Sequence, residues 1–344
     1  MKTPTLTPII GFLLLATFGS CQFFSSGSGA ASMGTNATGM PYEIVVVADQ
    51  TVWNDAAGSK MKDELLMAIP GLPQIEPSMR ITYVSPADFN GMMTYVRNIL
   101  VVTVDESKYT KASFNTERDK WANGQAVVYF TAPDKPALID YLDQHQGQLV
   151  DYFTKKELGR MANVYRKTYN TPLLDKLKEK FDIALYVPES FDSYKDTTGF
   201  LWTSNNANTG RMDIVVYTFP YTDANTFTKK YLIAMRDSIL GANIPGAFPH
   251  SYMATDTLMT MYTPVTLRGK YCGVLRGLWQ MEGDMMGGPF VSHARLDETR
   301  NRIVVTEGFV FSPETDKRNY IRRLEAVLYT LCLPGESGLP QETL

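Results

Sequence analysis

A short apolar run near the start of the chain limits which residues can build a folded body. Residues 8–18 carry no charge and follow the single cation Lys2, as in the hydrophobic region of a secretion signal. The run is too short to span a bilayer, which takes about 20 apolar residues. No second long apolar run follows, so we expect the remaining chain to fold as a soluble body around its own core.

The run ends in two small residues and a cysteine, Gly19, Ser20 and Cys21. This ending resembles the lipobox of bacterial lipoproteins. The resemblance implies that the signal, residues 1–20, is cut before Cys21, that the Cys21 thiol is linked to diacylglycerol, and that the new amino group is acylated with chains such as palmitate. Several chains anchor a protein stably, because each buried methylene contributes roughly 0.8 kcal/mol. An ordinary cleaved signal that happens to end in cysteine is the alternative.

Residues 21–40 are mostly small and polar, which is typical of a flexible tether. By resemblance to bacterial sorting rules, the lack of Asp after Cys21 argues against retention in the inner membrane. The lack of an acidic cluster there argues against export to the cell surface. We therefore expect a lipid anchor in the outer membrane with the body facing the periplasm, and surface exposure stays open as the alternative.

The charge balance and the cysteine count exclude several classes of protein. The chain has a net charge of −3, which becomes one unit more negative if Lys2 leaves with the signal, so nothing indicates a nucleic-acid partner. Besides Cys21 the chain has Cys272 and Cys332, which could pair in an oxidising compartment or stay as two buried thiols. So few cysteines exclude a cysteine-rich zinc site, and we expect no metal and no cofactor.

Strand-like and helix-like runs alternate through the body, which predicts an α+β fold. The β-branched run 42–49 has few polar breaks, a pattern typical of an inner strand covered on both faces. Further strands are predicted over 79–85, 98–105, 125–132, 183–187, 199–202, 212–218, 265–280 as a hairpin, 290–296 and 302–311. Helices are predicted over 60–69, 133–165 with a break near Gly147, 172–181, 223–240 with Asp223 as N-cap, and 314–331.

A weak internal echo divides the body into two halves. Phe130–Lys135 and Phe311–Lys317 each end a β-rich run and begin a helix. Duplication of a β-α-β-β-β-α unit would explain the echo and would give largely antiparallel sheets with helices packed on one face. Proline at the first helical turn explains the short match nearly as well. We expect two α+β halves, 41–170 and 171–333, that form one unit, followed by a disordered tail, 334–344.

Seven segments spread over the body carry a resemblance to a known family. They are Leu72–Pro77, Arg97–Leu100, Trp121–Gln125, Ser251–Met253, Arg276–Trp279, Met285–Phe290 and Glu307–Phe311. Together they resemble the domain of unknown function 4837 family, lipoproteins of the Bacteroidota, over about residues 40 to 332. The resemblance implies a single co-occurring unit, and it brings no activity, cofactor or catalytic residue.

No catalytic motif stands out. The chain has three histidines, His145, His250 and His293, and none belongs to a nucleophile elbow, a His-Glu-x-x-His helix or a phosphate loop. Acid/base or metal chemistry would need His250 or His293 to approach Glu282 or Asp284. We therefore assign no catalytic residue.

The stretch 276–290 has the composition of a binding loop. Its glycines let the backbone approach a ligand, while its other side chains offer stacking, adaptable apolar contact and hydrogen bonds. The candidates are Arg276, Trp279, Glu282, Asp284, Met285 and Met286. A hairpin connection whose Trp and Met residues roof the core is the simpler explanation. Likewise, Glu76 and Arg97 could line a polar cleft or form an ion pair that fixes the proline-rich loop 72–77.

One triplet suggests a modification. Asp256-Thr257-Leu258 resembles the acceptor used for O-glycosylation of exported proteins in this phylum, with Thr257 as the modified residue. Asp237-Ser238-Ile239 matches the same pattern, but it lies in a predicted helix and is the poorer candidate.

Two classes of function remain. The first is a lipid-anchored envelope protein that binds a protein partner or a glycan without catalysis. The second is a glycosidase-like envelope hydrolase that uses Glu282 and Asp284, with His293 as a possible third group. The hydrolase needs its two carboxylates about 5 to 9.5 Å apart in a cleft. We prefer the binding protein, because no catalytic group is evident.

Overall fold

The computed structural model describes residues 34–337, and residues 35–337 belong to one compact unit. The predicted signal, Cys21 with most of the predicted tether, and residues 338–344 of the predicted tail lie outside the described residues. Among the helices that the structure describes, none is long and apolar enough to cross a membrane.

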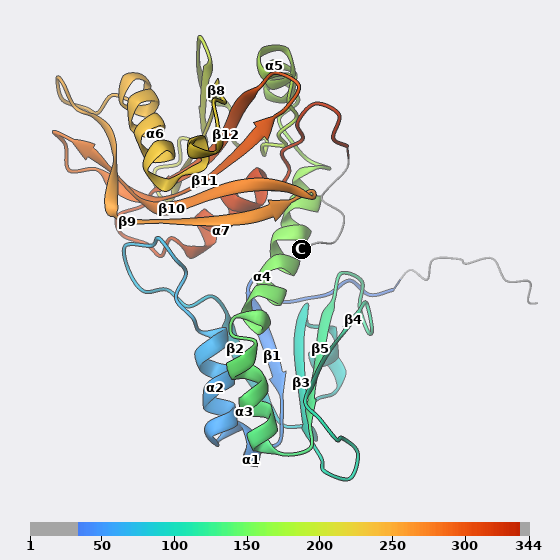
Figure 1. The fold of residues 1–344 in the computed structure, drawn as a ribbon. Coiled ribbons are helices and arrows are strands. Elements are labelled where there is room, and N and C mark those ends of the chain that lie inside the picture. Colours follow the sequence, from blue (N-terminus) through green and yellow to red (C-terminus); the bar gives the residue numbers. More distant parts are fainter. Residues whose placement is uncertain (1–33, 338–344) are drawn as a thin grey trace, which may run out of the picture. The chain divides into compact units, whose positions relative to one another are not determined.

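The first half builds a five-stranded sheet that is mostly parallel (Figure 1). Its strands are β1 (Glu43–Val47), β2 (Arg80–Val84), β3 (Asn98–Val104), β4 (Ser113–Arg118) and β5 (Ala126–Ala132), in the order β2-β1-β3-β5-β4. β1 pairs in parallel with β2 and β3, β3 pairs in parallel with β5, and β4 runs antiparallel to β5. Parallel neighbours need a crossover connection, and two helices supply it between β1 and β2.

Helices cover one face of this sheet and loops cover the other. α1 (Gln50–Trp53), α2 (Ala56–Leu65), α3 (Lys135–Gln144) and α4 (Gln148–Tyr165) pack on the face that Ile44 and Val46 share. Val45 and Val47 point to the opposite face, where loop residues cover them. β1 is thus buried on both faces, as its β-branched run predicted.

The second half builds a seven-stranded antiparallel sheet. In spatial order its strands are β6 (Ser193–Thr197), β7 (Phe200–Ser204), β8 (Arg211–Pro220), β12 (Arg302–Phe311), β11 (Gly287–Asp297), β10 (Lys270–Glu282) and β9 (Tyr252–Leu267). The outer strand β9 carries a bulge opposite Gly277, where residues 257–260 leave the ladder.

Both faces of the second sheet carry helices, whereas the sequence predicted helices on one face. α5 (Thr171–Phe181) and α7 (Arg318–Leu328) pack on the face of Ile214 and Val216. α6 (Lys229–Asn243) packs on the face of Val215 and Tyr217, and Figure 1 shows α6 and α7 on opposite sides of the strands. Alternate residues of β8 therefore enter different cores.

The predicted α+β class is confirmed, but duplication of one unit, the first of the two explanations for the echo, does not hold. The first sheet is mostly parallel and the second is antiparallel, so the two halves do not repeat one unit. Of the two echoed segments, 130–135 runs directly into α3, whereas 311–317 ends before α7 begins at Arg318. Asp134 caps α3, which has Pro136 among its first residues.

Some element boundaries differ from the predicted ones for local reasons. The break near Gly147 is confirmed, because Gly147 adopts a left-handed conformation with φ 83° between α3 and α4. The predicted helix 223–240 is two elements, since Asp223 caps the short 3-10 helix η2 (Ala224–Phe227) and Thr228 caps α6. The predicted strand 183–187 is irregular chain with an isolated bridge from Ala184 to Cys332.

The body begins earlier and ends later than predicted. The Ala37 backbone N–H donates to the Asn123 carbonyl, and that of Thr38 donates to the Tyr95 carbonyl, so residues 35–40 of the predicted tether lie on the body. At the other end, Glu336 accepts from the Leu333 backbone and pairs with Arg295. Residues 334–337 are therefore held in place, which corrects the prediction that they are disordered.

A carboxylate from the first half caps a helix of the second half. The start of α7 has no capping side chain of its own. Glu76, in the proline-rich loop, accepts from the backbone N–H groups of Lys317 and Arg318 at 2.8 Å each. It is buried, satisfies two N–H groups of the first turn and faces the positive end of the helix dipole.

We expect Glu76→Ala to lower the free energy of unfolding by about 1–2 kcal/mol, because it removes the cap of α7. Glu189→Ala, at an exposed loop position, is the control. Urea denaturation of both variants measures the difference, and equal stability of the two would contradict the capping role.

Candidate functional site

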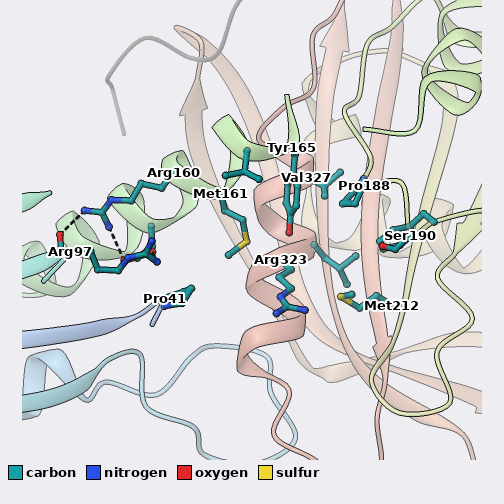
Figure 2. A pocket seen from close by; sticks show the side chains of 14 residues that line it. Pro41, Arg97, Arg160, Met161, Tyr165, Pro188, Ser190, Met212, Arg323 and Val327 are labelled. Atoms are coloured by element: carbon teal, nitrogen blue, oxygen red, sulfur yellow. Dashed lines mark hydrogen bonds and ion pairs between the residues drawn. The ribbon is translucent and has the colours of Figure 1, made fainter. Parts of the chain in front are cut away.

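A pocket of about 420 Å³ lies between α4 and α7, with the loop 188–191 and the start of β8 completing its wall (Figure 2). Its polar lining side chains are Arg97, Glu157, Arg160, Tyr165, Ser190 and Arg323. Its apolar lining side chains are Pro41, Met161, Val164, Pro188, Phe191, Met212, Leu324 and Val327.

Helix geometry brings the pocket residues of α4 together. Glu157, Arg160, Met161 and Val164 follow the i, i+3, i+4, i+7 spacing of one helix face. The first two contact the start of β3, and the last two line the pocket with apolar residues of α7. One face of α4 thus supplies both a polar end and an apolar wall.

A buried carboxylate organises the polar end. The Glu157 side chain is 1% exposed. Its Oε1 accepts from Asn98 Nδ2 and Arg160 Nη1 at 2.7 Å each, and its Oε2 accepts from Arg97 Nη1 at 3.1 Å. Arg160 also donates to the carbonyls of Gly124 and Arg97. Two guanidinium groups share one carboxylate, so this end keeps a net positive charge.

Other donors at the pocket are not used by the described residues. The Arg97 Nε is buried without a hydrogen-bond partner in the described structure. Arg323 is exposed on α7 and makes no hydrogen bond or ion pair with a described residue. Figure 2 shows Tyr165 and Arg323 facing the same space. Burial raises the pKa of Tyr165 although the Arg323 charge opposes this, so the hydroxyl stays protonated and can donate.

The sequence pointed to one residue of this pocket, Arg97, but with the wrong partner. Glu76 caps α7, whereas Arg97 pairs with Glu157, so Glu76 and Arg97 do not form the ion pair that was one of the two alternatives for them. Glu157 and Arg160 were not predicted to be site residues, because charged residues on a helix are usually solvated. Their spacing with Met161 and Val164 was the available signal.

The predicted binding stretch 276–290 is mostly structural. Trp279 is 2% exposed and donates its Nε1–H to the Val310 carbonyl at 3.1 Å, and Arg276 pairs with the buried Glu325 of α7. The roof-of-the-core explanation is thus confirmed for Trp279. Trp279 and Met286 do line a smaller pocket of about 270 Å³ under the loop 244–247.

The turn between β10 and β11 holds the remaining candidates. Met285 is fully exposed. Asp284 accepts from the Ala247 and Met285 backbones at 3.2 and 2.7 Å, which ties the turn to the loop after α6. Glu282 is exposed and accepts from Gln280 at 2.7 Å. These carboxylates are thus engaged in local turn contacts.

The histidines do not join these carboxylates. His293 is buried on β11 with its ring against Tyr329, at 5.4 Å between ring centroids, and neither ring nitrogen has a hydrogen-bond partner among the described residues. His145 stacks on Tyr141, and His250 lies in an exposed loop with φ 65°. The condition for acid/base chemistry, that His250 or His293 approach Glu282 or Asp284, is not met by His293, on which the charges of Glu325, Arg276 and Arg295 act instead.

The cysteines and the modification triplet have clear positions. Cys272 and Cys332 are both buried thiols and do not form a disulfide with each other, and burial raises the pKa of Cys272 to about 12. Thr257 is exposed in the β9 bulge, where Asp256 accepts from two following backbone N–H groups; its glycosylation stays a prediction. Among the described residues, no three His, Cys, Asp or Glu side chains gather as metal ligands would.

Acid should weaken the fold through His293. Burial lowers its pKa to about 3, although Glu325 opposes this, while an unfolded histidine titrates near 6.5. Below about pH 6.5 the unfolded chain binds a proton at this histidine that the folded chain does not bind. The free energy of unfolding therefore falls as pH falls from about 6.5 toward 3. From pH 7 to 5 we expect a loss of about 2 kcal/mol from this group.

We expect His293→Leu to remove that part of the pH dependence in urea denaturation at pH 7, 6 and 5. The control is His145→Leu, on an exposed position, which should keep the wild-type slope. An unchanged slope in His293→Leu would refute the assignment.

Comparisons with solved structures give weak likenesses. The Ran-binding protein Mog1p of Saccharomyces cerevisiae aligns with a TM-score of 0.30 and 11% identity, over 44% of this chain and 89% of its own. A protein of Bacteroides thetaiotaomicron aligns with a TM-score of 0.24 and 16% identity, over 45% of this chain and 47% of its own. The human StarD13 lipid transfer and protein localization domain aligns with a TM-score of 0.21 and 8% identity, over 46% of this chain and 98% of its own.

Family models match both halves of the chain, and no curated protein matches it. The model of the Domain of unknown function (DUF4837) matches residues 170–330, and that of the Domain of unknown function (DUF8532) matches residues 37–166. The segments of the first half that carried the resemblance therefore fall within the second of these models. The second half of the chain is thus similar to the DUF4837 family, and the first half is similar to DUF8532, both domains of unknown function.

Proposed function

We propose that this protein is a non-catalytic binding module, anchored in the outer membrane by lipid on Cys21 with its body in the periplasm, and that its ligand is a small anion with an apolar part. The observation that carries the proposal is the pocket between α4 and α7. Its one carboxylate, Glu157, is already bound by two guanidinium groups, while donors of Arg97 and Arg323 remain unused by the described residues.

Charge and hydrogen bonding favour an anion. Arg97, Arg323, the Tyr165 hydroxyl and the Ser190 hydroxyl all line the pocket and can all donate. A carboxylate or phosphate supplies several acceptor atoms and a negative charge, and guanidinium groups bind both in a planar, two-pronged way. A cationic ligand would meet an unbalanced positive charge.

The rest of the wall favours an apolar body attached to that anion. Met161 and Val164 of α4 face the same space as Leu324 and Val327 of α7, and Val164 is 58% exposed. Covering such side chains contributes about 25 cal/mol per Å² of apolar surface removed from water. Methionine adapts its shape to a ligand, so we expect tolerance of different apolar bodies.

No comparable observation favours the alternative of a carboxylate-dependent hydrolase. Glu282 and Asp284 lie at an exposed turn, and His293 lies in the core under α7. A binding role through the pocket needs no catalytic group.

We expect wild-type protein to bind dodecanoate or dodecyl phosphate and Arg323→Gln to bind the same probe about tenfold more weakly, because one charge-assisted hydrogen bond contributes about 1.5–3 kcal/mol. Isothermal titration calorimetry measures both dissociation constants. The control is Arg300→Gln, which removes an arginine that pairs with Asp182, away from the pocket lining. Binding of neither probe, or equal binding by Arg323→Gln, would refute the proposed ligand class.

We expect Cys21→Ala to move the protein from the membrane fraction to the soluble periplasmic fraction, because the variant has no thiol to carry the lipid. Ser28→Ala, which changes the tether and keeps the thiol, should stay with the membrane. Immunoblots of fractionated cells separate the two, and a Cys21→Ala protein still in the membrane would contradict the anchor.

A further inference from the structure

A second, smaller cavity adjoins the proposed ligand pocket. It has a volume of about 110 Å³ and shares Pro41, Met161 and Arg323 with the larger one. Its other lining residues include Arg80 on β2 and Arg318 at the start of α7. The two cavities therefore adjoin at the three residues that they share.

Positive charge dominates the smaller cavity too. Arg80, Arg318 and Arg323 line it against one carboxylate, Glu43. Glu43 already accepts from the Met40 backbone at 3.0 Å and from Arg80 at 3.4 Å. The chain as a whole carries a net charge of −3, so this gathering of arginines is local and not a property of the whole surface.

Two of these arginines can reach a ligand. The Arg80 side chain is 69% exposed and its pairing with Glu43 is long, so it can turn toward an anion at small cost. Arg318 uses one Nη to hold the Pro77 carbonyl at 2.9 Å, which orients the guanidinium beside the cavity and leaves its other Nη available to a ligand.

We infer that the ligand of the proposed pocket carries two separated anionic groups on one apolar body. This inference rests on the proposed function. One anionic group lies with Arg97 and Arg323 in the larger cavity, and the other lies with Arg80 and Arg318 in the smaller one. The apolar part that connects the two groups lies against Pro41 and Met161, which line both cavities. Carboxylate and phosphate both satisfy this chemistry.

The test compares ligands that differ only in the second anionic group. Alkane α,ω-dicarboxylic acids of increasing length are titrated by calorimetry beside monocarboxylic acids with the same number of carbons, and alkane diphosphonates beside monophosphonates. We call the probes with two anionic groups two-headed and those with one anionic group one-headed. We expect a range of chain lengths at which the two-headed probe binds at least tenfold tighter than the one-headed probe with the same number of carbons. If only the diphosphonates bind more tightly than their one-headed counterparts, the second group belongs to the phosphate class. If the dicarboxylic acids also bind more tightly, the second group is an anion of either class.

Arg80→Gln should reduce the ratio of the two affinities at least threefold. Lys108→Gln is a matched control, because Lys108 and Arg80 are 67% and 69% exposed and each pairs with one acidic side chain. The control should keep the wild-type ratio. If one-headed probes bind and two-headed probes gain nothing at any length, the inference is wrong while the proposed function stands. If neither class binds, both fail.

Discussion

A single buried carboxylate, Glu157, joins α4 to the first sheet at the edge of the pocket. Burying a charge costs several kcal/mol unless partners compensate for the lost water. Here Asn98 and two arginines surround the carboxylate, and Asn98 also donates to the Glu43 carbonyl on β1 at 2.8 Å. The first sheet thus holds α4 through this side chain, and the far end of that helix contacts α7.

A second buried carboxylate, Glu325, holds α7 through ion pairs with Arg276 and Arg322. Burial alone would raise the pKa of Glu325, but Arg276 and Arg322 lower it to about 2. The Arg322 guanidinium also lies 5.5 Å from the ring centre of Tyr42 in the first half. Together with the Glu76 cap, these contacts fix α7 against residues from both halves of the chain. The pocket between α4 and α7 therefore has walls that are held by charges as well as by packing.

Much of the fold could be predicted from the sequence, but little of the site could. An unbroken β-branched run identified β1, and Gly147 identified the break between α3 and α4, because both signals are local. β4 and β6 were missed, since their segments Ser113–Arg118 and Ser193–Thr197 are polar outer strands. Glu157 and Asn98 lie 59 positions apart, so no local pattern could reveal that they meet.

The glycines of the stretch 276–290 misled the prediction for a physical reason. A Cβ at Gly288 would lie 2.0 Å from the Val310 carbonyl oxygen, and one at Gly277 would lie 2.3 Å from the Thr260 hydroxyl. These positions need glycine so that neighbouring strands and the β9 bulge can approach closely. Glycine that makes room for protein and glycine that makes room for a ligand have the same sequence signature.

The bulge in β9 also has a consequence for how copies of this protein coexist. β9 is a 16-residue strand at the open edge of the sheet, and such an edge is a template on which another chain can add a strand. Residues 257–260 interrupt the ladder halfway along it, and Pro264 has no N–H to offer. The edge is thereby divided into two short paired segments, 252–256 and 261–267, and a bulge of this kind disfavours the addition of a strand from another copy.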